Sequence, residues 1–180
     1  MLTPEELRRF QFFDALDGDQ LQAVAVLAET VIVHANEPFF FEGQPADALF
    51  LVADGGVELY HNVEAPGAAH TRAAEAVYQL MEEGAAIPML EGQGGVLSEW
   101  KVGEIGPGEI VGMSAIIPPH ILTATARASR PSRLVKIDAV ALRHAGERQP
   151  MLMNRLLTAT AQVAMARLKY ARSRLIASVA

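Results

Sequence analysis

The side chains whose types and spacing suggest binding chemistry lie between residues 112 and 127. Thr123, Thr125 and Arg127 alternate along the chain, so on a strand they would share one face and offer two hydroxyl groups and a guanidinium. His120 precedes them and could donate to an anion when protonated, although a loop histidine is more often simply exposed. Arg127 lies about 13 Å beyond Thr123 on an extended chain, so the pattern indicates at most a weak anion site.

No motif indicates an enzyme or a metal centre. The sequence has no phosphate-binding loop, no G-x-S-x-G turn and no H-E-x-x-H helix. Its five histidines show no metal spacing, and the absence of cysteine excludes disulfides, thiolate ligands and cysteine nucleophiles. Glu82 and Glu83 are adjacent carboxylates, but neighbours on a helix point in different directions. We therefore expect a protein that is not an enzyme and has no metal or cofactor.

Eight short β-prone runs must position these residues, separated by segments rich in Gly, Pro, Asn and Asp. This spacing predicts an α+β chain that is mainly β, an eight-stranded antiparallel β-roll or jelly roll. Two N-terminal helices are expected before it, the first capped by Thr3 and the second over residues 20–28. The runs cover residues 30–34, 38–41, 48–52, 56–60, 99–105, 109–111, 122–128 and 132–137.

The strand pattern is interrupted over residues 62–97. The centre of this insertion, residues 71–85, reads as a helix with loop-like flanks. It could be a lid or contact a partner, but a surface insertion without a special role is the favoured interpretation.

A long helix is predicted from Met151 almost to the end of the chain. Its apolar residues alternate spacings of four and three, which makes a heptad-like seam, and a second apolar row runs beside it. A helix of about 28 residues, roughly 42 Å long, exceeds what one small β-roll covers. We therefore expect residues 1–148 to form the β-roll domain and residues 149–180 to form a homodimerisation element. The expected dimer interface consists of Leu157, Ala161, Ala164, Leu168 and Leu175.

Charge is divided unevenly along the chain. Residues 1–100 contain 17 acidic and 3 basic residues, and residues 101–180 contain 4 acidic and 12 basic residues. Internal complementarity or plain solvation explains such a split better than a dedicated anionic partner. With no secretion signal and no apolar run long enough to span a bilayer, we expect a soluble cytoplasmic protein.

Two stretches resemble the cyclic-nucleotide-binding domain family, which includes catabolite-activator-type regulators, cyclic-nucleotide-dependent kinases and gated channels. Residues 38–60, with EGQPAD at 42–47 and glycines at 43 and 55, are similar to the strand–turn–strand entry of the family. Residues 103–128 are similar to its phosphate-binding cassette and the strand that follows. The resemblance covers nearly the whole chain apart from the insertion, and implies a sensor domain without the DNA-binding helix-turn-helix of the activators. Nucleic acid is therefore an unlikely partner.

The cassette of this family holds a cyclic phosphate with an arginine and backbone N–H groups, and a glutamate accepts from the ribose hydroxyl. Aligned with that pattern, Met113 stands at the glutamate position and Leu122 at the arginine position. Two charge-assisted hydrogen bonds of roughly 1.5–3 kcal/mol each are lost, which lowers affinity by a factor of about 10² to 10⁴. The resulting degenerate pocket comprises Gly112, Met113, Ser114, Ala115, Leu122, Thr123 and Ala124.

These observations leave two functions open. The first is a regulatory or interaction module that dimerises, contacts a possible protein partner and does not bind cyclic AMP or cyclic GMP tightly. The alternative is a sensor that binds an unknown small molecule in the β-roll, such as an apolar effector, an atypical cyclic nucleotide or haem.

Overall fold

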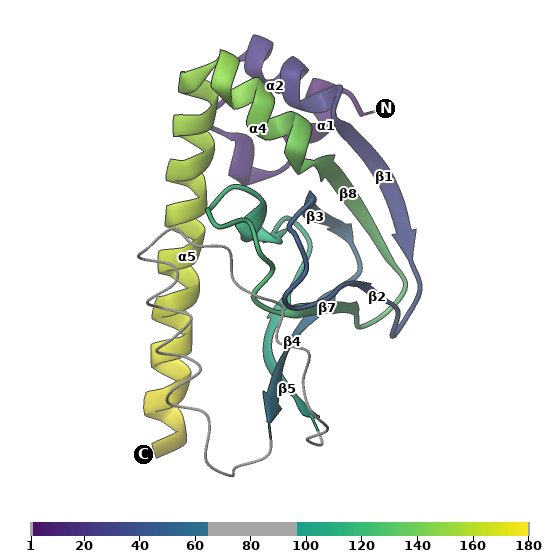
Figure 1. The fold of residues 1–180 in the computed structure, drawn as a ribbon, viewed down its shortest axis with the longest axis vertical. Coiled ribbons are helices and arrows are strands. Elements are labelled where there is room, and N and C mark those ends of the chain that lie inside the picture. Colours follow the sequence, from purple (N-terminus) through teal and green to yellow (C-terminus); the bar gives the residue numbers. More distant parts are fainter. Residues whose placement is uncertain (1, 65–96, 180) are drawn as a thin grey trace.

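The chain folds into two four-stranded antiparallel sheets flanked by helices, as expected (Figure 1). This computed structural model describes residues 2–64 and 97–179. The helix predicted over 71–85 and the Glu82–Glu83 pair lie outside the described residues.

The N-terminal helices begin where their capping residues predict. Thr3 caps α1 (Pro4–Leu7), and the Glu6 side chain accepts from the Thr3 N–H in return. A 3-10 turn, η1 (Gln11–Phe13), follows. Asp17 caps α2 (Gly18–Ala25), which therefore starts and ends earlier than the predicted range 20–28. The prediction was wrong at its end because Ala28 already belongs to the first strand.

The eight strands pair into two sheets that form a β-roll. One sheet has the order β1-β8-β3-β6 and the other β2-β7-β4-β5, and every pairing is antiparallel. The strands are β1 (Ala28–Val33), β2 (Pro38–Phe40), β3 (Ala48–Asp54), β4 (Val57–Glu64), β5 (Leu97–Ile105), β6 (Ile110–Val111), β7 (Thr125–Ala128) and β8 (Ser132–Asp138).

The strand predicted over residues 122–128 begins only at Thr125. The backbone of Leu122 forms hydrogen bonds with the turn at 43–44. Its N–H donates to the Gln44 carbonyl and its carbonyl accepts from the Gly43 N–H, both at 2.8 Å. Residues 122–124 therefore follow the turn at 43–46 rather than the ladder of the sheet. Thr123 consequently does not share a strand with Thr125 and Arg127.

The core lies between the two sheets and under the helices. β3 is buried over five successive residues, since both of its faces are covered. Leu49 of β3 pairs with Ile137 of β8 and Val52 with Leu134, and all four side chains are fully buried.

The chain ends in two helices. Asp138 caps α4 (Ala139–Arg148), and α5 (Pro150–Val179) follows directly. Figure 1 shows α5 running along one side of the molecule, with α1, α2 and α4 gathered around its first turns. In the described part of the chain no helix is both long and apolar enough to cross a membrane.

Ion pairs join the acidic first part of the chain to the basic second part, in agreement with the charge split. Arg155 on α5 pairs with Asp17 at the start of α2 at 2.8 Å. The pairs Lys101–Glu58, Arg127–Glu99 and Lys136–Glu29 follow the same rule. The two halves of the sequence are therefore complementary within one fold.

Candidate ligand site

The cassette begins where β6 ends. Gly112 adopts a left-handed conformation (φ +79°) and starts the short 3-10 helix η2 (Met113–Ala115). A Cβ on Gly112 would meet the Ala48 carbonyl oxygen at 3.2 Å, in addition to the strain of the positive φ. A glycine is therefore required for the chain to turn from the sheet into η2.

The structure brings some of the predicted pocket residues together and leaves others apart. Ala115 is fully buried and Leu122 is 5% exposed, while Met113 is half-buried against the core. Leu122 Cδ2 lies 3.9 Å from the position of a Cβ on Gly112, so the two halves of the cassette meet there. Ser114 and Ala124 are half-buried, but Thr123 is exposed.

Aromatic side chains fill the space beside Gly112. Phe40 Cε1 lies 3.8 Å from the position of a Gly112 Cβ, on the same side as Leu122. The Phe40 ring packs edge-on against Phe39 and tilted against Phe50, with centroids 5.1 and 5.9 Å apart. Phe40, Phe50 and Leu122 are all buried, so the protein's own side chains occupy this part of the β-roll.

The cationic side chains nearest the cassette are already engaged. Arg127 Nη2 donates to both carboxylate oxygens of Glu99, at 2.9 and 3.2 Å, and the guanidinium lies over the Tyr60 ring. Its strand neighbours Ala126 and Ala128 are fully buried, so Arg127 points away from the core. Its guanidinium is therefore engaged at the outer surface of the sheet.

Arg143 and His120 hold the cassette through its backbone. Arg143, on α4, donates to the Ala115 carbonyl at 2.9 Å and to the Ala46 carbonyl at 3.3 Å. His120 Nδ1 lies 3.0 Å from the Ser114 carbonyl oxygen, and this histidine is half-buried rather than exposed. Both side chains therefore fix η2 in place.

A charged cluster on β4 and β5 lies apart from the cassette. Glu58 accepts from Lys101 and from the Tyr60 hydroxyl, and these hydrogen bonds lower the pKa of Glu58. The same carboxylate raises the pKa of Tyr60 and, together with Glu104, that of Lys101. Lys101 bridges the two carboxylates and so joins β4 to β5 at the sheet surface.

Sequence reasoning missed Arg143 and the aromatic cluster. The three consecutive phenylalanines at 39–41 were a visible signal for a bulky group at the pocket. Arg143 carried no comparable signal, because only the packing of α4 places it beside residues 46 and 115.

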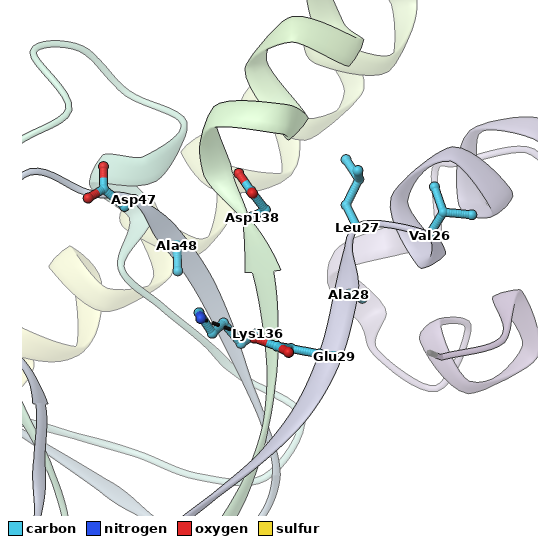
Figure 2. Close-up of a pocket in the computed structure, with 8 residues that line it drawn as sticks. All are labelled: Val26, Leu27, Ala28, Glu29, Asp47, Ala48, Lys136 and Asp138. Atoms are coloured by element: carbon cyan, nitrogen blue, oxygen red, sulfur yellow. Dashed lines mark hydrogen bonds and ion pairs between the residues drawn. The ribbon is translucent and has the colours of Figure 1, made fainter.

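One cavity of the described surface, about 540 Å³ in volume, lies beside the β1-β8-β3 sheet, and none of the cassette residues lines it. Figure 2 shows Lys136 joined to Glu29 on neighbouring strands, with the carboxylates of Asp47 and Asp138 pointing away from that pair. Asp138 already caps α4. Among the described residues, no group of three or more side chains is arranged to hold a metal ion.

The chain is similar to solved cyclic-nucleotide-binding domains over most of its length. A structure described as a cyclic nucleotide-binding protein from Geobacter metallireducens GS-15 is 28% identical, with a TM-score of 0.70, covering 93% of this chain and 99% of that one. A cyclic nucleotide-binding domain from Methylobacillus flagellatus KT is 17% identical, with a TM-score of 0.65, covering 97% and 80%.

The catabolite activator protein of Thermus thermophilus is 20% identical, with a TM-score of 0.57, covering 93% of this chain and 62% of that one. No family model matches the chain, and no curated protein matches it. The chain therefore has the fold of the cyclic-nucleotide-binding domain, as the resemblance implied.

Proposed function

We propose that this chain is a regulatory or interaction module that dimerises through α5 and does not bind cyclic AMP or cyclic GMP tightly. The observation that carries the nucleotide part of the proposal is Leu122. It stands at the arginine position of the cassette and is buried beside Gly112 and Phe40.

A cyclic phosphate at this place would meet an apolar side chain instead of a guanidinium. An anion in an enclosed site needs a compensating charge or several strong donors. Two arginines on neighbouring elements could supply the missing positive charge. Arg127 donates instead to Glu99, and Arg143 donates to backbone carbonyls. The backbone donors of η2 alone would leave affinity about 10² to 10⁴ lower than in a complete cassette.

The dimer part of the proposal rests on the two faces of α5. One face is buried by the domain at Leu152, Leu156 and Thr160. Two leucines of the predicted seam, Leu157 and Leu168, are 41% and 43% exposed.

A second copy of the chain is the occupant that fits this seam. A row with heptad spacing along a 30-residue helix is complementary to itself, and a twofold axis brings the same row of each copy together. Ala161 and Ala164 allow close approach between the leucines. Completing the burial of half-exposed Leu157 and Leu168 contributes about 1 kcal/mol for each side chain, which favours association through this face.

Light scattering on the purified chain tests the dimer. We expect a mass twice the 19.4 kDa of one chain, and Leu168→Glu should give the monomer because it places two carboxylates in the seam. Ser173→Glu is the matched control, since it adds the same charge to α5 at an exposed position outside the seam. A wild-type monomer, or dissociation by both variants alike, contradicts the proposal.

A further inference from the structure

The last turns of α5 stand clear of the β-roll. Every residue from 168 to 177 is exposed, whereas Leu152 and Leu156 near the start of the helix are buried by the domain. Figure 1 shows this end of α5, drawn in yellow, far from α1, α2 and α4. The described part of the domain therefore covers one face of the first half of the helix and leaves its last turns exposed.

One face of these turns combines apolar and basic side chains. We call this face the basic stripe, and it consists of Met165, Lys169, Arg172 and Ile176. Spacings of four, three and four residues place these side chains on one side of a helix. At about 100° per residue, this side lies opposite Leu156 and therefore away from the domain. Met165 and Ile176 are 64% and 71% exposed, and both cations between them are exposed as well.

The two cations of the stripe have no counter-ion on their own helix. Residues 148–180 contain six basic residues and no acidic residue. Among the described residues, neither Lys169 nor Arg172 forms an ion pair, whereas Arg155 near the start of α5 is paired with Asp17. The stripe therefore presents positive charge that the described part of the fold does not neutralise.

Charge and apolar area together decide which kind of partner fits the stripe. The α5 of a second copy does not match it, because that helix carries no carboxylate. A nucleic acid matches the cations but leaves Met165 and Ile176 in water. A bilayer surface favours helices whose basic and apolar residues lie on opposite faces, whereas here they share one face. An acidic amphipathic helix of another protein offers carboxylates beside apolar side chains, and so matches both.

We propose that the basic stripe docks an acidic amphipathic helix of another protein. Its carboxylates pair with Lys169 and Arg172, and its apolar residues cover Met165 and Ile176. Exposed ion pairs are individually weak and are screened by salt, so the apolar ends supply the part of the affinity that does not depend on charge. The inference names the partner of the interaction module proposed above and rests on that part of the proposed function alone.

Fluorescence anisotropy of a labelled peptide tests this docking on the full chain. The probe is a helix of about 20 residues with leucine along one side and glutamate on both flanks, and the control probe has glutamine in place of glutamate. We expect a dissociation constant of about 10–100 μM for the acidic peptide at about 0.15 M salt, and at least about tenfold weaker binding of the control probe.

Two charge variants locate the peptide on the helix. Lys169→Gln/Arg172→Gln should weaken binding of the acidic peptide about tenfold. Arg148→Gln/Arg174→Gln is the matched control, since it removes the same charge from exposed positions outside the stripe and should bind as the wild type does. All four positions are exposed, so the fold should be retained, which circular dichroism checks.

A third variant tests the apolar part of the stripe. Met165→Gln/Ile176→Gln keeps both cations and should also weaken binding of the acidic peptide, whereas a partner held by charge alone would not respond. Equal binding by the wild type and Lys169→Gln/Arg172→Gln, or the same loss in the matched control, overturns the proposal. Tighter binding of a short DNA duplex, or of vesicles containing phosphatidylglycerol, overturns the assignment to a protein partner.

Light scattering on the same samples separates this inference from the dimer. A dimer that does not bind the acidic peptide overturns this inference alone. A monomer that binds the peptide contradicts only the dimer, because the stripe and its cations belong to a single copy of α5.

Discussion

Replacing Leu122 with alanine tests whether the cassette is filled by its own side chain. Leu122 is 5% exposed and lies next to Gly112, with Phe40 on the same side. The substitution keeps both backbone hydrogen bonds to the 43–44 turn and removes only the buried atoms. Truncating a buried leucine costs about 2–5 kcal/mol, depending on how far the neighbours collapse.

Thermal unfolding followed by circular dichroism measures this loss. For a chain of this size about 1 kcal/mol corresponds to roughly 2–4 °C in Tm, so we expect Leu122→Ala to unfold about 4–20 °C lower. Val26→Ala is the control, because Val26 is 51% exposed and should change stability by less than about 0.5 kcal/mol. A Leu122→Ala variant as stable as Val26→Ala would refute the reasoning, since Leu122 would then not occupy the pocket.

Two further substitutions test the turns and caps that frame the domain. Gly55→Ala should lower the free energy of unfolding, measured by urea titration, by about 2 kcal/mol or more. Gly55 has φ +96°, and an added Cβ would lie 2.6 Å from Ser132 Cα. Gly18→Ala is the control, because Gly18 lies in open space at the start of α2 and its replacement should be neutral or slightly stabilising in the same titration. Asp17→Ala should lower Tm near neutral pH, because the Gln20 N–H and Arg155 hold the pKa of Asp17 below its ordinary value of 3.8. That stabilisation is fully present above the unfolded pKa and is lost as pH falls through the lower folded value, so wild type and variant should converge in strong acid; a constant difference across that range would contradict the assignment.

The strands and caps could be predicted because their signals are local. Short β-prone runs between segments rich in Gly, Pro, Asn and Asp predicted all eight strands to within four residues at each end, and Thr3 caps α1 as predicted. The heptad spacing of α5 is likewise a property of one segment, and the dimer interface it predicts stays a prediction.

The contents of the pocket could be predicted only in part, because they depend on contacts between distant segments. Met113 and Leu122 were recognisable as departures from the family pattern. The pairing of Leu122 with the 43–44 turn, which shortens β7, is not encoded in the residues next to it. Arg167 is buried because α5 docks on β6. The sequence shows Arg167 only as one of several basic residues on the helix, so its burial could not be predicted.

Calorimetric titration of the purified chain with cyclic AMP and cyclic GMP tests the central claim most directly. With Leu122 in place of the arginine and Met113 in place of the glutamate, we expect dissociation constants of about 1 mM or weaker for both nucleotides. Saturable binding of either nucleotide tighter than about 10 μM would contradict the account, because it would require a compensating cation that Arg127 and Arg143 do not provide.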